Sequence, residues 1–430
     1  MGRGEDTRST VTSTWELSLA ALQGTGLTHA RDLLLTLSCF APAPIPAELC
    51  PPSELGEFVE STAAAEDSLH GLLQLGLIET ADSSPYSGQP AVTIHPLLAE
   101  TMRRDPGNSL TESLRRAARI FAGATASLRA EYPADRASWL SLLPHLRAML
   151  SITAVRAFPL LADLSSGAID ALCWAGSYRA AREFAEFALS RLSELDPTGE
   201  SILHLRFRHA GALRLDGEAA AAEKEHRDVL RAQLRLFDPD SPTVLTTQHY
   251  LAVDLLSQGK YAEAQQLFQH VIDRRLQTLG SNHPHTLATR HQLAAVLMRS
   301  GRPAQAEGQS REVLEARLRV LGPDHPSTIS TQGDIAEALA AQGNHSAAEV
   351  LLRTVIAART RALGPTHPVT LRTRHDLAAN MAAQGRHAEA IAAMRQVLAA
   401  QTEALSIGDP SIQQTLDWLN NELRSHPQRH

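Results

Sequence analysis

The sequence comprises 430 residues with a formal net charge of −7 at pH 7, few aromatic residues, and three cysteines, Cys39, Cys50 and Cys173. The acidic balance gives no reason to expect a nucleic-acid or anionic-membrane partner, and no stretch approaches the roughly 18 apolar residues of a membrane span. The cysteines form no C-x-x-C pair, which argues against a disulfide framework or a zinc knuckle and fits a cytoplasmic location.

The first third of the chain alternates between helical and turn-rich segments. Residues 1–12 are polar, and we expect them to be disordered. Apolar helical patterns follow at 29–41 and 57–76, and residues 77–94 predict a β-hairpin, the only β-structure expected in the chain. Helices followed by a β-wing over 13–105 are the pattern of a winged-helix domain.

Four segments of this region resemble the winged-helix subdomain of NB-ARC-type STAND switch ATPases of actinobacterial style. They are TWELSLAAL, LLLTLSCFAPAPIPAEL, LLQLGLIE and VTIHPLLAETMR. The segment ASWLSLLPHLRAML at 137–150 is similar to the linker helices of those proteins, and we assign residues 106–157 to linker helices. The resemblance implies that tetratricopeptide sensor repeats follow.

The phosphate-binding motif of that ATPase family is missing from this sequence. No G-x-x-x-x-G-K-[ST] segment is present, so the backbone cradle and the lysine that hold a nucleotide are not available. The ATPase core is therefore absent, and we expect no cofactor. The chain is then either a truncated relative of such an ATPase or the partner of a separate nucleotide-binding chain.

A winged helix also raises the hypothesis of DNA binding. The candidate recognition helix, residues 60–75, carries Glu60, Glu66 and Asp67 but neither arginine nor lysine. Phosphate contacts dominate protein–DNA affinity, so nucleic acid is a disfavoured partner. We expect a packing or regulatory role for this region.

From about residue 201, four series of residues recur every 42 positions. Proline fits the first turn of a helix, glycine fits the left-handed turn between two helices, and alanine permits two helix axes to cross closely. The members are Pro242, Pro284, Pro326, Pro368 and Pro410; Gly217, Gly259, Gly301, Gly343 and Gly385; Ala210, Ala252, Ala294, Ala336 and Ala378; and Ala222, Ala264, Ala306, Ala348 and Ala390.

The repeated unit is similar to the long tetratricopeptide repeat of kinesin light chains. It appears as TQHYLA at Thr247, TRHQLA at Thr289, TQGDIA at Thr331 and TRHDLA at Thr373. The resemblance implies a mostly α-helical fold, a right-handed α-solenoid of helix pairs preceded by a small α+β winged-helix domain.

Domain boundaries follow from this period. We assign a degenerate helix pair to 158–200, five repeats to 201–410, a C-terminal cap helix to 411–424 and a disordered tail to 425–430. Trp418 and Leu419 are expected to pack the cap helix against the last repeat.

The first helix of each repeat lines the concave groove of such a solenoid, where partners bind. The apolar floor, imidazoles and isolated arginines of this groove suit an extended peptide with apolar anchors and some acidic character. By register, the inward-facing residues are His249, Val253, Leu256, His291, Ala295, Met298, Arg299, Glu337, Arg372, His375 and Ala379.

Histidine recurs at one groove position, in His249, His291 and His375, and Gly333 interrupts the series. Contact with a peptide and packing between repeats are both open interpretations. A metal site is not expected there, because equivalent positions in adjacent repeats lie about 10 Å apart, whereas each zinc ligand lies about 2 Å from its ion.

Other polar series have structural interpretations. Asp334 and Asp376 lie one repeat apart, and we expect them to be solvated or paired with Arg290 or Arg374. A helix-start role is expected for the histidines that precede the repeated prolines, His283, His325 and His367.

The function favoured by these patterns is a non-enzymatic scaffold or sensor in bacterial signalling or regulation, with a peptide or partner domain in the concave groove. No G-x-S-x-G elbow or catalytic cysteine signature is present, so no catalytic residue is predicted. One alternative is a transcriptional or signalling regulator whose winged helix contacts DNA. A more distant alternative is an enzyme or enzyme accessory with a cleft between the two parts of the chain.

Overall fold

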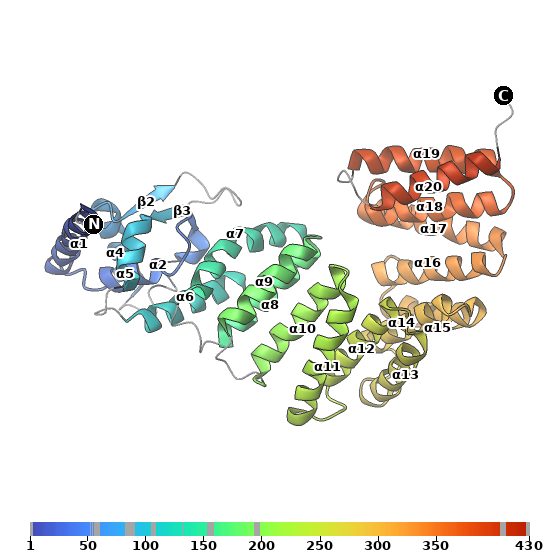
Figure 1. The fold of residues 1–430 in the computed structure, drawn as a ribbon, viewed down its shortest axis with the longest axis horizontal. Helices are drawn as coiled ribbons and strands as arrows, with labels where there is room; N and C mark the ends of the chain where they lie inside the picture. Colours follow the sequence, from blue (N-terminus) through green and yellow to red (C-terminus); the bar gives the residue numbers. More distant parts are fainter. Residues whose placement is uncertain are drawn as a thin grey trace. The chain divides into compact units, whose positions relative to one another are not determined.

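The computed structural model describes residues 3–51, 53, 55, 61–81, 91–104, 109–130, 132–152, 159–192, 198–404 and 410–426. The chain forms two compact units, Met1–Leu236 and Phe237–His430, and the described residues are mostly helical, as predicted (Figure 1). No helix among the described residues is long and apolar enough to cross a membrane.

Among the described residues, the first unit begins with helices α1, α2 and α4, and the first of them is longer than expected. Helix α1 spans Arg3–Gly24, so the expectation that residues 1–12 are disordered was wrong. The stretch from 5 to 23 contains neither glycine nor proline, and nothing in it interrupts the helical hydrogen-bond ladder. Helix α2 spans Ala30–Leu37, and α4 spans Thr62–Gln74.

Helix α4 begins where a side chain caps it. The Ser61 hydroxyl accepts a hydrogen bond from the Ala64 backbone N–H at 3.1 Å, which satisfies one of the free donors of the first turn. The helix predicted over 57–76 is therefore described from this cap onward, and residues 56–60 lie outside the described part of the chain.

The first unit contains a small antiparallel sheet in the order β1-β3-β2. Strands β2 (Ile78–Ala81) and β3 (Ala91–Ile94) form the predicted hairpin, and its connection, 82–90, lies outside the described residues. The expectation of no other β-structure was wrong, because β1 (Ile45–Pro46) pairs with β3. Ile45 lies opposite Val92, and β1 forms an edge of the sheet, where a strand proline is tolerated.

The helices predicted as a linker belong to the core of the first unit. After the short helix η1 (Ala47–Leu49), the chain continues through α5 (Pro96–Arg104), α6 (Leu110–Thr125) and α7 (Pro133–Leu150). One hydrophobic cluster runs from Leu19 in α1 to Ala212. In α7, Trp139 packs so closely on Gly167 that a Cβ there would lie 2.8 Å from the indole ring.

Three helix pairs can be followed from the end of the first unit into the second. Helices α8 (Pro159–Trp174) and α9 (Tyr178–Arg191) occupy the segment predicted as a degenerate pair. Helices α10 (Glu200–Leu215) and α11 (Ala219–Leu236) form the first predicted repeat, and α12 (Pro242–Ser257) and α13 (Tyr261–Thr278) form the second. The two compact units therefore divide within the array predicted over 201–410.

The remaining helices of the second unit pack as successive pairs (Figure 1). They are α14 (Pro284–Arg299) with α15 (Pro303–Val320), α16 (Pro326–Ala341) with α17 (His345–Leu363), and α18 (Pro368–Ala383) with α19 (His387–Ala404), followed by α20 (Pro410–Ser425). Leu419 of α20 is buried in a cluster with Met394 of α19, and Trp418 packs against it. The tail predicted over 425–430 is described only to His426.

Local chemistry sets the ends of these helices. The turns between paired helices place Gly301 and Gly343 at φ of 77° and 83°, where a Cβ would be strained. The predicted helix-start role of the repeated histidines is confirmed, because each Nδ1 accepts a backbone N–H of the following helix. The distances are 3.2 Å for His283, 3.1 Å for His325 and 3.3 Å for His367.

Buried arginines connect each repeat to the next. Arg275 of α13 donates to the Thr289 hydroxyl at 2.6 Å and to the His285 carbonyl at 2.9 Å. Arg317 of α15 donates in the same way to Thr331 and Ser327. These bonds fix the first helix of each repeat on the second helix of the repeat before it.

A charged cavity in the fourth and fifth repeats

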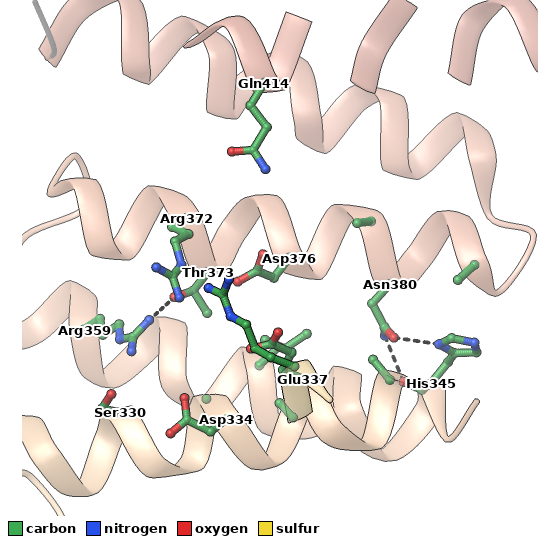
Figure 2. A pocket seen from close by; sticks show the side chains of 17 residues that line it. Ser330, Asp334, Glu337, His345, Arg359, Arg372, Thr373, Asp376, Asn380 and Gln414 are labelled. Atoms are coloured by element: carbon green, nitrogen blue, oxygen red, sulfur yellow. Dashed lines mark hydrogen bonds between the residues drawn. The ribbon is translucent and has the colours of Figure 1, made fainter. Parts of the chain in front are cut away.

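The repeat surface contains a cavity of about 570 Å³ between α16 and α18. Figure 2 shows Asp334 and Glu337 along one helix and Arg372 and Asp376 along the neighbouring one. Helix α17 contributes Arg359, Leu352 and His345, and Gln414 of α20 lies at the opposite side. Small residues form much of the remaining lining: Ser330, Gly333, Ala336, Ala340, Ala379 and Ala383.

Glycine at position 333 explains why the cavity opens at this repeat. The equivalent residues of the other helices in this series are His249, His291 and His375, each with an imidazole. At Gly333 no side chain is present, and a Cβ there would lie in ordinary contact with Arg359, 3.6 Å from its Nη2 atom. Because this repeat has glycine in place of histidine, no imidazole fills the space, and the charged side chains around it are exposed.

Three arginines and three carboxylates line this cavity. Burial raises the pKa of Glu337, and the nearby Asp334 and Asp376 raise it further, whereas Arg372 and Arg299 oppose the shift. The carboxylates are therefore crowded enough to repel one another, and the arginines hold them in place. The resulting surface offers both hydrogen-bond donors and acceptors to a ligand.

Arg359 is fixed by the protein, whereas Arg372 is exposed. The Arg359 guanidinium donates to the Thr373 hydroxyl and, at 3.4 Å, to the Val369 carbonyl. Burial lowers the pKa of Arg359, and the nearby Arg372 adds to this shift. Arg372 keeps its side chain exposed at the cavity wall, where it can reach an acidic group of a ligand.

Reciprocal hydrogen bonds between His345 and Asn380 close one end of the cavity (Figure 2). The His345 Nδ1 lies 3.0 Å from Asn380 Oδ1, and the Asn380 amide donates to the His345 carbonyl at 2.9 Å. Asn380 is buried, and these two hydrogen bonds hold its side chain at the end of the cavity.

A smaller cavity of about 340 Å³ adjoins this one at the end of the array. Arg372, Asp376 and Gln414 line both cavities. His375, which also lines the smaller cavity, lies 6.5 Å from the Trp418 ring, centroid to centroid. The two cavities are therefore parts of one polar surface that continues from α16 to α20.

The predicted groove residues separate into two groups in the structure. Arg299, Glu337, Arg372 and Ala379 line the larger cavity, and His375 lines the smaller one. The others do not line either of these two cavities: His249, Val253, Leu256, His291, Ala295 and Met298.

Several residues of the second group do not line either cavity because they pack between helices. His249 is only 9% exposed, its Nδ1 lies 3.3 Å from the Thr289 hydroxyl, and its ring packs edge-on against Phe268. Val253 and Leu256 pack against the same core. This geometry favours packing between repeats, one of the two interpretations left open for the histidine series.

His291 makes an ion contact with the following repeat. Its Nδ1 lies 3.0 Å from Oδ2 of Asp334. Asp334 was expected to be solvated or paired with an arginine such as Arg290. Arg290 forms an ion pair with Glu312 instead, because its side chain reaches α15 of the same repeat. Asp376 is exposed, in line with the solvated interpretation, and lies 3.8 Å from the His375 Nδ1.

Sequence reasoning missed Arg359, Gly333 and Asn380 as determinants of the cavity. Arg359 belongs to a series with Arg275 and Arg317 at the same 42-residue step as the prolines and glycines, so the period itself could have identified it. The role of Gly333 depends on what surrounds a missing side chain, which no spacing reveals.

The cysteines offer no reactive thiol. Burial raises the pKa of both Cys39 and Cys50 to about 12 and that of Cys173 to about 11. Only the thiolate is strongly nucleophilic. These three side chains are therefore packing residues at neutral pH.

Sequence comparison assigns the repeats. The tetratricopeptide repeat model matches residues 200–277, 243–317, 285–361 and 336–403. Residues 200–403 are thus a tetratricopeptide repeat array, and repeats of this kind typically act as protein-interaction scaffolds. No curated protein matches the chain.

Solved structures share the helical-repeat arrangement at low similarity. The putative kinesin light chain TPR-like repeats of Podosopora anserina are 29% identical, covering 49% of this chain and 98% of that one, with a TM-score of 0.42. A STAND protein with a tetratricopeptide repeat sensor from Pyrococcus horikoshii is 13% identical over 91% of this chain and 65% of that one, with a TM-score of 0.44.

A Rap protein complexed with competence and sporulation factor is 10% identical over 76% of this chain and 92% of that one, with a TM-score of 0.47. All three TM-scores are below 0.5, so the repeat assignment depends on the sequence match and on the helix pairs themselves.

Proposed function

We propose that this protein is a non-enzymatic scaffold or sensor that binds an extended peptide segment in the charged cavity between α16 and α18. The observation that carries the proposal is the opening at Gly333, which leaves about 570 Å³ lined by three arginines and three carboxylates. This volume lies within the range of about 300–1,000 Å³ typical of ligand sites. The partner is a protein, and its site comprises the fourth and fifth repeats.

The charges define the kind of peptide that fits. Arg372 and Arg299 can each bind a carboxylate through two parallel N–H donors, which favours an acidic side chain. Asp334, Glu337 and Asp376 accept hydrogen bonds and suit the backbone N–H groups of an extended chain. The alanines and Leu352 leave room for a small apolar side chain between them.

The N-terminal segment supports a regulatory or docking role. Helices α1, α2 and α4 and the sheet β1-β3-β2 fit the winged-helix domain proposed for 13–105. Within the described residues, α4 carries Glu66 and Asp67 and no basic residue, which disfavours the DNA-binding alternative. A separate nucleotide-binding chain in the cytoplasm is the second partner that the resemblance to STAND ATPases suggests.

The test begins with peptides selected by display against the full-length protein, whose affinities are then measured by fluorescence polarisation. Two variants alter the cavity: Arg372→Ser, which installs the residue found one repeat earlier at Ser330, and Gly333→His, which installs the imidazole of the other repeats. Each is expected to weaken binding by about 1.5–3 kcal/mol, the value of a hydrogen bond to a charged group.

The matched control is Arg395→Ser, which removes an exposed arginine from α19. It should leave the affinity unchanged. Gly333→His should not lower the melting temperature, because glycine is a poor residue inside a helix. Selected peptides that bind both cavity variants as tightly as the unaltered protein would refute the proposal.

A further inference from the structure

Two histidines and a glutamate come together where the last helix meets the last repeat. His387 is the first residue of α19, Glu422 lies in the last turn of α20, and His426 directly follows that helix. One ligand atom of each residue lies within 4.8 Å of the other two. Among the residues that the structure describes, this is the one such group of three potential metal ligands.

The contacts inside this group hold the three side chains close together. The His387 Nδ1 lies 2.6 Å from the Glu422 Oε1. The rings of His387 and His426 stack with centroids 3.6 Å apart and planes tilted by 18°. The two imidazoles and the carboxylate therefore share one small volume at the surface.

The preceding repeat shows what this position does without a metal-binding set. There His345 occupies the place of His387, and Asn380 occupies the place of Glu422, each 42 residues earlier. The Asn380 amide and His345 satisfy each other by hydrogen bonds. In the last pair a carboxylate replaces that amide, and a second imidazole is added.

We propose that His387, Glu422 and His426 bind a divalent transition metal ion of the zinc class. Two imidazoles and a carboxylate are a common zinc ligand set, and water completes the coordination of such a site. The metal would join the end of α20 to the start of α19 and would hold the last helix on the array.

The adjustment required is small. Zinc lies about 2.0–2.2 Å from nitrogen and oxygen ligands, so the ligand atoms must come within about 3–3.5 Å of one another. His426 is exposed and its ring can turn from the stacked position. The nearby Arg386 does not oppose a cation, because it forms ion pairs with Glu349 at 2.8 Å and Glu389 at 2.7 Å.

The experiment titrates ZnCl2 into the full-length protein by isothermal titration calorimetry near pH 7.5. We expect stoichiometric binding that is weakened at least tenfold in His387→Ala and in His426→Ala, since even changes to outer-shell groups cost about 10–100-fold. Glu422→Gln preserves the size of the side chain but removes its charge and should also weaken binding. Circular dichroism checks that each variant keeps its helices.

The matched control is His345→Ala, which removes the equivalent histidine of the preceding repeat and should leave the zinc affinity unchanged. Zinc should also raise the melting temperature of the unaltered protein, because the ion binds the folded state. Absence of stoichiometric binding, or binding that persists in both histidine variants, would overturn the proposal. Peptide affinity is measured separately, so this result is independent of the proposed function.

Discussion

At the scale of single residues, His145 shows how a charge-sensitive group is held neutral in a core. It is 1% exposed, and its Nδ1 accepts a hydrogen bond from the Ala41 backbone N–H at 3.2 Å. Its ring meets Phe40 edge-on. Burial lowers the pKa of His145 from 6.5 to about 4, and a hydrogen bond with the Pro44 backbone only partly offsets this effect.

This shift predicts a loss of stability in mild acid. Because the folded pKa lies below the unfolded one, the unfolded chain binds more protons between pH 6.5 and about 4. The stabilisation that depends on neutral His145 is fully present above pH 6.5. It is lost as the pH falls to about 4. Its full size is about 3 kcal/mol, from roughly 1.4 kcal/mol per pKa unit.

The measurement is urea unfolding of the full chain at a series of pH values, with the transition of the first unit followed separately. His145→Gln removes the titrating group, so its unfolding free energy should depend less on pH in this window. The exposed His270 provides a control, because His270→Gln should leave the pH dependence as it was. Identical pH profiles for the unaltered protein and His145→Gln would contradict the argument.

His145 also shows where sequence reasoning reaches its limit. The segment 137–150 was assigned to a linker helix through its resemblance to STAND ATPases, and no pattern in it indicated burial. Its partners Phe40 and Ala41 lie more than 100 residues earlier in the chain. No local pattern indicates that contact, so the burial of the histidine could be found only in the structure.

At the scale of helices, the buried arginines determine how repeats join. Burial lowers the pKa of Arg275 and of Arg317. Each of these arginines donates a hydrogen bond to a threonine hydroxyl of the next repeat, not to a carboxylate. One period before and one after the three arginines, the sequence has Gln233 and Gln401, both buried. The repeat structure therefore tolerates a neutral amide side chain at the position equivalent to these arginines.

This comparison predicts different costs for two substitutions of Arg317. Arg317→Ala removes the guanidinium that donates to the Ser327 carbonyl and the Thr331 hydroxyl, and it should lower the free energy of unfolding by about 2–3 kcal/mol. Arg317→Gln keeps a donor and avoids burying a charge, so its effect should stay within about 1 kcal/mol.

Denaturant unfolding of the second unit checks both values. Arg319→Ala, on the exposed side of the same helix, is the control and should change stability by less than about 0.5 kcal/mol. Equal losses for Arg317→Ala and Arg317→Gln would mean that the guanidinium itself, rather than a donor at this register, is required.

The 42-residue period allowed the repeat helices to be predicted, because proline, glycine and alanine have direct consequences for helix starts, turns and crossings. The short strand β1 was missed, since two residues carry no alternating pattern and their partners lie at 91 and 92. Helix α1 was missed because its start, rich in serine and threonine, has low intrinsic helix propensity.

The candidate site was only partly predictable for a related reason. Register alone placed Arg299, Glu337, Arg372 and Ala379 on one surface, and all four line the larger cavity. It also placed His249 there, but the side chains of Phe268 and Thr289 cover that ring. Register describes an idealised repeat, whereas exposure depends on the neighbours that each repeat carries.

At the scale of the whole molecule, the chain combines a first unit with one continuous core and a second unit whose helix pairs present a charged cavity. The first unit contains the small sheet, and the second contains the peptide site that we propose. Under this proposal, partner recognition belongs to the second unit.

Photo-crosslinking of a selected peptide to the full-length protein tests this assignment most directly, with the attachment sites located by mass spectrometry. We expect adducts on the cavity-lining residues of α16 and α18, between 330 and 340 and between 372 and 383, and their loss in Gly333→His. Adducts confined to residues 3–236, or unaffected by Gly333→His, would contradict the account.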